Sequence, residues 1–296
     1  MKKIISVVLR KGGTGKTTTL MALADGLAIR GEKVLVIDLD SQMNLSMLYG
    51  NFHLKEKSIF NVLTEKSFNI YDAIYSIPDN YFNNIEVKGK IDIIPANSYV
   101  DQLDKSLDEM MRKEERLLRA IQKLNPDDYD YVLIDTGPIN VTNVVITNVI
   151  VASDEIILPA RLEELSYKGI ELILPRVEMV IEEELNPELK INGILATQVI
   201  GKRKNTNKNL YNKLIEYAKK KNIYVYENYI RNLEGVVAKQ YVHESIFNPK
   251  VFEKEIIHKD GTVTKRKFTA QSEIAKDYNE FINEFLEREE KYNAKI

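Results

Sequence analysis

A glycine-rich segment near the start of the chain combines the residue types that bind phosphate. It reads Arg10-Lys11-Gly12-Gly13-Thr14-Gly15-Lys16-Thr17-Thr18 and follows an apolar run at residues 4–9. Glycines let successive backbone N–H groups converge on phosphate oxygens, in a conformation that side chains would obstruct. Lys16 can then reach the β- and γ-phosphates of a nucleotide, and the Thr17 hydroxyl can bind Mg²⁺. The segment therefore predicts a site for a nucleoside triphosphate and Mg²⁺.

Two further apolar runs end in carboxylates that suit the same chemistry. Asp40 closes the run that begins at Val34, and Asp135 closes the run that begins at Tyr131. We expect Asp135 to face Mg²⁺, through coordinated water, because Mg²⁺ dehydrates reluctantly. A carboxylate beside the phosphate loop at the C-terminal end of a strand, such as Asp40, can orient or activate an attacking water. Asp38 stays ambiguous between a water-mediated contact to Mg²⁺ and a structural role.

These side chains need strands and helices that bring them to one edge of a sheet. Apolar runs rich in β-branched residues predict buried parallel strands at 4–9, 33–38, 91–95, 131–135, 155–159 and 191–198. Helical patterns lie between them at 17–30, 99–124, 166–184 and 208–221, each long enough for the crossover that parallel strands require. The alternation predicts a single α/β domain over residues 1–296, with a doubly wound, mostly parallel sheet and helices on both faces.

Two segments fit this scheme poorly, and we expect them to be peripheral insertions at about 51–90 and 250–268. The first is rich in Asn, Tyr, Lys and Glu and has only weak periodicity. The second predicts a hairpin of strands at 252–258 and 262–268, because Asp260-Gly261 between two β-prone runs favours a tight turn. The apolar spacing within 270–286 predicts a C-terminal helix that packs back on the sheet.

Composition excludes several classes of protein. The chain of 296 residues is 44% hydrophobic, which is enough for a sizeable core. It has no Cys, which excludes disulfides, iron–sulfur clusters and thiolate zinc sites. The net charge of −2 means that any nucleic-acid surface must be a local patch. The N-terminal apolar run is too short for a signal peptide and no run approaches the ~18 residues of a membrane-spanning helix, so we expect a cytoplasmic protein.

The glycine-rich segment resembles the deviant Walker A box of the ParA/MinD/nitrogenase-iron-protein group of P-loop ATPases. Arg10 stands where the general phosphate-loop pattern has glycine, and a second lysine, Lys11, stands at the loop entrance. In that family the first lysine reaches across a nucleotide-sandwich dimer to the partner's phosphates. The resemblance therefore implies a homodimer joined by ATP and Mg²⁺, with Lys11 beside Lys16 and Asp40 among the catalytic residues.

The resemblance continues downstream of this loop. Residues 34–42 are similar to the family's second motif, with Ser41 in place of the usual proline, and they imply that Asp40 acts on the attacking water. Residues 130–138 resemble the Walker B strand that ends in Asp135. Residues 229–232 are similar to the segment that borders adenine, which implies that Arg231 and Asn232 bind ATP. The similarity covers roughly residues 1–50 and 90–250.

A local excess of basic residues lies between residues 202 and 221. Eight residues are Lys or Arg, against Glu216 as the single acidic residue. Such a patch suits sequence-independent contacts with DNA phosphates. The same charges are also typical of an ordinary solvated helix face, an alternative that the sequence leaves open. The residues that we expect to contact DNA are Lys202, Arg203, Lys204, Lys208 and Lys219.

Together with the resemblance, these features favour a DNA partition ATPase that forms an ATP-sandwich dimer, binds nonspecific double-stranded DNA and releases it on hydrolysis. We expect weak hydrolysis, stimulated by a centromere-binding, ParB-like adaptor protein, and an association with the nucleoid rather than with a membrane. Two alternatives stay open: a metabolic P-loop enzyme that acts on a small substrate, and a MinD-like positioning ATPase. The terminal stretch 287–296 has no apolar face, which argues against a membrane-binding helix of the MinD kind.

Overall fold

Strands and helices alternate in the computed structural model, which describes residues 3–9, 11–138, 144–199, 204–232, 243–257, 263–270 and 272–294. The strands are β1 (Lys3–Val7), β2 (Lys33–Leu39), β3 (Tyr75–Ser76), β4 (Lys90–Ile94), β5 (Tyr131–Thr136), β6 (Glu155–Arg161), β7 (Lys190–Thr197), β8 (Lys250–Ile257) and β9 (Val263–Ala270). The helices are α1 (Lys16–Arg30), α2 (Asn44–Gly50), α3 (Ile59–Thr64), α4 (Leu103–Asp108), α5 (Arg116–Ile121), α6 (Val144–Ala152), α7 (Glu164–Glu182), α8 (Lys204–Lys220) and α10 (Glu273–Asn293).

Seven strands form one sheet, in the order β3-β4-β2-β5-β1-β6-β7. Neighbouring strands pair in parallel except β3, which runs antiparallel to β4 at the sheet edge. β1 lies between β5 and β6, and its register places Val7 opposite Asp135. The loop after β1 therefore emerges at the same edge of the sheet as the C-terminal ends of β5 and, one strand further, β2, which is where ligands bind in sheets of this kind. The predicted fold class, a mostly parallel sheet of the P-loop NTPase type, is confirmed.

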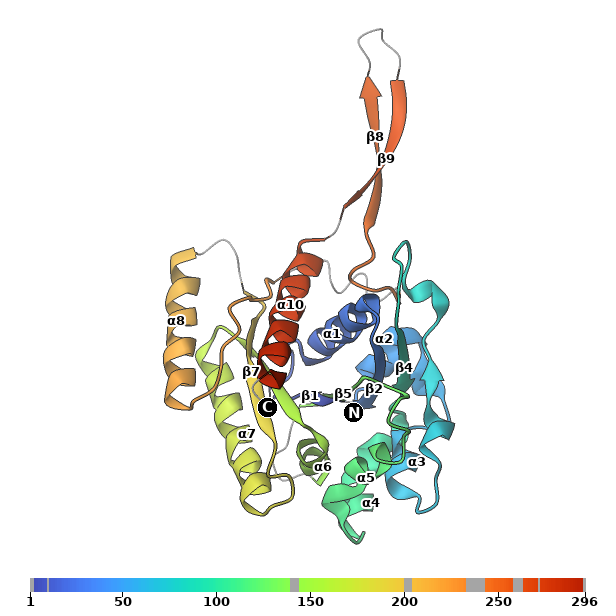
Figure 1. The fold of residues 1–296 in the computed structure, drawn as a ribbon, viewed down its shortest axis with the longest axis vertical. Helices are drawn as coiled ribbons and strands as arrows, with labels where there is room; N and C mark the ends of the chain where they lie inside the picture. Colours follow the sequence, from blue (N-terminus) through green and yellow to red (C-terminus); the bar gives the residue numbers. More distant parts are fainter. Residues whose placement is uncertain are drawn as a thin grey trace.

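Helices cover both faces of this sheet. On one face lie α1, α2 and α10, which bury side chains such as Leu23, Leu45 and Phe281. On the opposite face lie α3 to α8, with side chains such as Leu103 and Leu214 in a second core. Figure 1 shows α10, near the end of the chain, lying along α1, the helix that follows the glycine-rich loop. The C-terminal segment therefore helps to hold the helix that carries the predicted phosphate site.

One predicted helix, over residues 99–124, is wrong. The structure has a 3-10 turn at Ser98–Gln102, then α4, a second 3-10 turn at Lys113–Glu115, and α5. Arg112, between α4 and α5, has a φ of 53°, and this left-handed conformation cannot continue an α-helix. Conversely, α6 was not predicted, because its sequence VVITNVIVA is rich in β-branched residues and has no helical periodicity.

The two expected insertions differ in how they are packed. Residues 51–90 supply the edge strand β3 and place Ile70 in one core and Tyr81 in the other. β8 and β9 pair as an antiparallel hairpin, as predicted, and Figure 1 shows it projecting away from the sheet. The expected turn at 258–262 lies outside the described residues. Whether either segment is an insertion relative to the family stays a prediction.

The C-terminal helix is present but longer than predicted, since α10 continues to Asn293. Its first half buries Ile274, Tyr278 and Phe281 against α1, as the apolar spacing indicated. Within the described ranges, no helix combines the length and the apolar character needed to cross a bilayer.

Candidate functional site

The glycine-rich loop between β1 and α1 has the geometry of a phosphate-binding loop. Gly13 and Gly15 have φ values of 70° and 86°, left-handed conformations that glycine adopts at little cost. Gly15 is the N-cap of α1, and its carbonyl accepts a hydrogen bond from the Thr19 N–H at 2.8 Å. The first N–H groups of α1 have no partner within the helix, so they and the helix dipole favour an anion at this end.

A cavity of about 770 Å³ lies against this loop. The predicted ATP-binding residues that line it are Gly12, Gly13, Gly15, Lys16, Thr17 and Thr18. A second part of the lining comes from the chain that follows β2 and from His243, which precedes β8. It comprises Gln42, Asn44, Met47, Leu48, Asn51 and His243. These wall residues were not identified from the sequence, because no local pattern connects α2 or His243 with a phosphate loop. Asp40 and Pro138 also line the cavity, close to the predicted Mg²⁺ site.

The end of β7 fixes the shape of the phosphate loop. Thr197 Oγ1 donates a hydrogen bond to the Thr14 carbonyl at 2.8 Å, and Gln198 Nε2 donates one to the Gly13 carbonyl at 2.7 Å. Thr14 itself is fully buried, so it supports the loop from inside rather than lining the cavity. Thr197 and Gln198 could not be identified from the sequence, since each lies more than 180 residues from its partner along the chain.

The two lysines of the loop have different surroundings. Lys16 lines the cavity, is 7% exposed, and donates a hydrogen bond from Nζ to the Lys11 carbonyl at 3.3 Å. Burial lowers the pKa of Lys16, and the nearby carboxylates of Asp135 and Asp40 act in the opposite direction. Lys11 is not among the cavity-lining residues, and its Nζ forms an ion pair with Glu163, 2.5 Å from Oε1. Lys16 therefore lies in the cavity beside the loop, whereas Lys11 is directed toward the start of α7.

Asp135 and Thr17 fit the role predicted for them at a Mg²⁺ ion. The Thr17 hydroxyl donates a hydrogen bond to Asp135 Oδ2 at 2.7 Å. Asp135 is fully buried, and among the described residues its Oδ1 has no hydrogen-bond partner. Burial raises the pKa of Asp135 well above its usual range, and Asp38 and Asp40 add to this effect. A buried carboxylate oxygen without a partner, beside a threonine hydroxyl, offers oxygen atoms that suit a hydrated Mg²⁺ ion.

Asp40 and Asp38 differ in what they contact. Asp40 lines the cavity, and its Oδ1 accepts a hydrogen bond from the Gln42 N–H at 2.9 Å. Gly137 lies so close that a Cβ atom there would be 2.7 Å from Asp40 Oδ1. Asp38 is fully buried and accepts hydrogen bonds from the Asp40 N–H and from both the N–H and the hydroxyl of Ser46, at 3.0, 2.9 and 2.7 Å. Asp38 therefore holds the loop between β2 and α2, and a water-mediated contact with Mg²⁺ stays a prediction.

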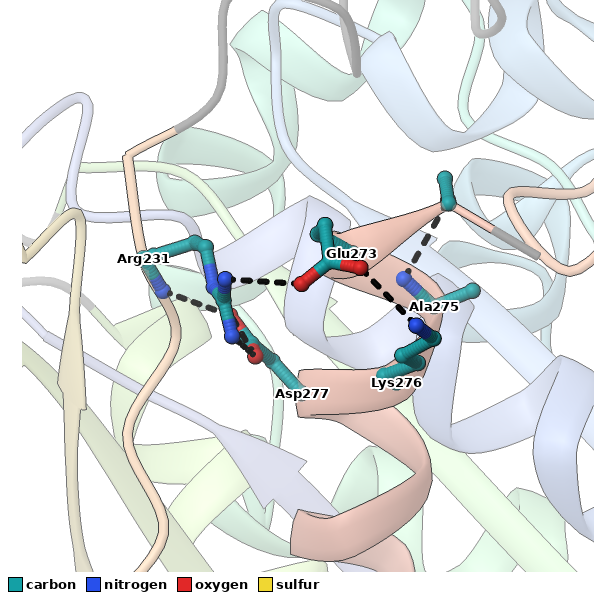
Figure 2. Close-up of polar contacts among 6 residues, drawn as sticks. Arg231, Glu273, Ala275, Lys276 and Asp277 are labelled. Atoms are coloured by element: carbon teal, nitrogen blue, oxygen red, sulfur yellow. Dashed lines mark hydrogen bonds and ion pairs between the residues drawn. The ribbon is translucent and has the colours of Figure 1, made fainter. Parts of the chain in front are cut away.

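Arg231 and Asn232 are not among the described residues that line the cavity. Figure 2 shows the Arg231 guanidinium directed at two carboxylates of α10, Asp277 and Glu273. Arg231 Nε and Nη2 lie 2.8 and 2.7 Å from the Asp277 oxygens, and Nη1 lies 3.0 Å from Glu273 Oε2. The Asn232 N–H donates a hydrogen bond to the Val199 carbonyl at 2.9 Å. The predicted contact of these two residues with adenine stays a prediction, and the ion pair gives Arg231 a structural role that can be tested against it.

The predicted DNA-binding residues lie at α8 or just before it. Lys202 and Arg203 lie outside the described residues, and Lys204 is the first residue of α8. The side chains of Lys208 and Lys219 are exposed, whereas Leu214 of the same helix is fully buried against the sheet. Helix α8 therefore presents basic residues to solvent on the side opposite its apolar contacts. The further exposed lysines are Lys213, Lys220 and Lys221.

Comparisons with known proteins agree with this fold. A family model described as an AAA domain matches residues 2–191. The sporulation initiation inhibitor protein Soj of Bacillus subtilis is 31% identical over 200 residues, which are 67% of this chain and 74% of Soj. The chromosome partitioning protein ParA of Caulobacter vibrioides is 31% identical over 197 residues, 66% of this chain and 69% of that protein.

Two solved structures share the fold over most of the chain. A plasmid partition protein of Borrelia burgdorferi bound to AMPPNP superimposes with a TM-score of 0.71 at 23% identity, over 97% of this chain and 100% of that one. Cobyrinic acid a,c-diamide synthase of Mycobacterium smegmatis, with bound ADP and magnesium, gives a TM-score of 0.68 at 25% identity, over 82% of this chain and 93% of that one. The fold, the phosphate loop and the similarity to Soj and ParA lead to one conclusion: the chain belongs to the ParA family of P-loop ATPases.

Proposed function

We propose that this chain is a DNA partition ATPase. In this proposal ATP and Mg²⁺ join two copies into a sandwich dimer, the dimer binds double-stranded DNA without sequence preference, and hydrolysis releases the DNA. A centromere-binding adaptor of the ParB kind stimulates an otherwise weak hydrolysis. The observation that carries the proposal is the pair of lysines in one loop, since Lys16 lines the cavity while Lys11 pairs with Glu163 outside it.

The chemistry follows from the residues around the cavity. Lys16 and the N–H groups of the loop hold the β- and γ-phosphates and offset their charge. Thr17 and Asp135 hold Mg²⁺, which when bound neutralises charge on the phosphates during transfer. Asp40 lines the same cavity and orients the attacking water through a carboxylate that Gly137 and the Gln42 N–H keep in place.

The assignment of Lys11 to an interface rests on its position and charge. Its side chain is 31% exposed, so the ion pair with Glu163 lies at the surface, where such pairs contribute little to stability. Lys11 can therefore exchange Glu163 for a more highly charged partner at small cost. The triphosphate of a second copy, docked face to face, would be such a partner.

The DNA-binding role rests on α8. Its exposed lysines suit contacts with phosphates, which supply affinity but no sequence information. Pairing two copies doubles this surface, and linked contacts raise avidity without any new interaction. DNA binding should therefore depend on the ATP-bound dimer.

Light scattering with ATP and Mg²⁺ tests the dimer directly. Asp40→Ala should trap a dimer, because its carboxylate acts on water rather than on the phosphates. Lys11→Ala should bind nucleotide as a monomer. Lys57→Ala is the matched control, since Lys57 also forms an exposed ion pair, with Asp72, but lies outside the glycine-rich loop, and it should dimerise normally. Monomers from Asp40→Ala together with dimers from Lys11→Ala would reverse these assignments.

One solved structure supports a second candidate, a metabolic enzyme. Cobyrinic acid a,c-diamide synthase shares the fold at 25% identity. An ATPase assay with DNA, with lipid vesicles and with neither distinguishes the classes. Stimulation by DNA and adaptor supports the partition ATPase, stimulation by vesicles supports a MinD-like protein, and no response to either supports the metabolic enzyme.

A further inference from the structure

A buried carboxylate, Asp25, lies in the middle of α1, nine residues after Lys16. It is 1% exposed and accepts three hydrogen bonds from hydroxyl groups. Tyr49 donates to Oδ1 at 3.1 Å, while Tyr81 and Ser245 donate to Oδ2 at 3.0 and 2.6 Å. Among the residues that the structure describes, the titratable groups bonded to it are the two tyrosines, and no cation contributes to the shift of its pKa. Burying a carboxylate without a cation is costly, so an apolar residue would fill this space more favourably.

The three donors come from three separate segments of the chain. Tyr49 belongs to α2, Tyr81 to a 3-10 turn at Asp79–Tyr81, and Ser245 to the segment that precedes β8. The Tyr49 and Tyr81 rings contact each other, with centroids 5.0 Å apart, and the Ser245 N–H donates to the Tyr81 carbonyl at 3.2 Å. Because hydrogen bonds are directional, a fully satisfied buried network of this kind fixes one arrangement of the segments that meet in it.

Two of these segments form the wall of the cavity that faces the phosphate loop. Met47, Leu48 and Asn51 line the cavity on either side of Tyr49, and His243 lines it two residues before Ser245. His243 Nδ1 donates to the Leu48 carbonyl at 3.2 Å, which joins the two parts of this wall. Asp25 therefore ties the wall formed by α2 and residues 243–248 to the helix that carries the phosphate loop.

Helix α2 is held at both ends by carboxylates of the core. Asp38 binds Ser46 in its first turn, and Asp25 binds Tyr49 near its last residue. The segment between β2 and α2 contains Asp40, so the position of α2 also sets the position of this carboxylate in the cavity. We propose that Asp25 is a positioning residue for nucleotide binding and hydrolysis, which sets the distance between the phosphate loop and the α2 wall. This inference rests on the proposed ATPase function.

Asp25→Asn tests the inference, because it keeps the shape of the side chain but removes one acceptor oxygen. The matched control is Asp92→Asn: Asp92 is 4% exposed and accepts hydrogen bonds from the hydroxyls of Ser76 and Tyr129, but its contacts lie in β3, β4 and the chain before β5. Two measurements are needed, the affinity for a fluorescent ATP analogue and the hydrogen exchange of residues 44–51 and 243–248 in the nucleotide-free protein.

Asp25→Asn should weaken ATP binding about tenfold, equivalent to about 1.4 kcal/mol, and speed exchange in both segments. Asp92→Asn should do neither. Should Asp25→Asn fail to fold, Tyr49→Phe removes a single donor and should weaken ATP binding by about threefold.

Unchanged exchange in both segments, or faster exchange with ATP affinity and turnover within about twofold of the wild type, would overturn the inference. Equal losses of affinity in Asp25→Asn and Asp92→Asn would also overturn it, since the effect would then be one of general stability. A wild-type protein that binds no ATP would refute the proposed function, and the exchange measurement would still decide whether Asp25 holds the wall.

Discussion

Replacing Arg231 with Met separates its structural role from the predicted contact with adenine. Methionine keeps an aliphatic stem of similar reach and removes the guanidinium. Asp277, whose side chain is 4% exposed, then loses the donors Nε and Nη2 but keeps the hydrogen bond from the backbone N–H of residue 231 at 3.0 Å. The pair with Glu273 is exposed and contributes little.

The size of the effect follows from these contacts. Hydrogen bonds to a charged group contribute about 1.5–3 kcal/mol, and the partial exposure of Arg231 places the expected loss at about 2 kcal/mol. At about 2.1 cal/mol/K per residue, a chain of this length unfolds with an entropy of about 0.6 kcal/mol/K. The melting temperature should therefore fall by about 3 °C.

Differential scanning calorimetry and an ATP titration of the same variants provide the assay. Asp277→Asn should lower the melting temperature by a similar amount, and the double variant should lose less than the sum of the two, because both changes break one interaction. ATP affinity should change by less than about twofold in each. An Arg231→Met protein that melts normally but binds ATP at least about tenfold more weakly would refute this reasoning and support the contact with adenine.

Further changes test other parts of the site. Lys16→Ala should lower ATP affinity by at least about 100-fold, because the phosphates lose their nearest cation; normal affinity in a filter-binding assay would contradict the phosphate-loop assignment. Gly137→Ala should slow steady-state hydrolysis about tenfold while ATP affinity is kept, because the new methyl group would meet Asp40 Oδ1 at 2.7 Å; unchanged turnover would show that Asp40 can move freely. Burial raises the pKa of Asp25 to about 7, so at pH 5 the folded chain holds this proton whereas the unfolded chain, with an ordinary aspartate pKa, has lost it. Urea unfolding should therefore show the wild type gaining about 3 kcal/mol relative to Asp25→Asn as the pH falls from 8 to 5, and a constant difference would contradict that titration.

The sequence predicted the parallel strands well, because strands buried on both faces are continuous apolar runs that need no knowledge of their neighbours. β2 begins at the expected residue, Lys33, and ends one residue beyond the expected end, at Leu39. The prediction of one continuous helix over 99–124 was wrong because the backbone at Arg112 is left-handed. The sequence there has no glycine to indicate this conformation. Helix α6 was not predicted because its β-branched residues favour strands in isolation. Only packing against the sheet makes this segment helical.

The residues of the site that are contiguous in sequence were predicted, and those that are distant in sequence were not. The residues from Gly12 to Thr18 are contiguous, so their spacing alone indicated a phosphate loop. The supports of the loop are distant in sequence: Thr197 bonds to Thr14 across 183 residues, and Ser245 bonds to Asp25 across 220. Asp25 lies within a largely apolar helical stretch that is buried on nearly every side, where a single polar residue gives no sign that three hydroxyl groups converge on it. Long-range polar contacts of this kind become visible only when the fold has brought the segments together.

The central claim, an ATP-dependent dimer that binds DNA, is tested most directly by fluorescence anisotropy of a labelled duplex. With ATP and Mg²⁺ the protein should bind two duplexes of unrelated sequence equally, and with ADP it should bind neither. Affinity should fall steeply with salt. Replacing Lys208, Lys213 and Lys219 with Ala should lower the log–log slope by about 0.9 for each DNA phosphate that the protein no longer neutralises, whereas Lys105→Ala in α4 should leave the slope unchanged. Equal binding with ATP and with ADP, or no binding at low salt, would contradict the account.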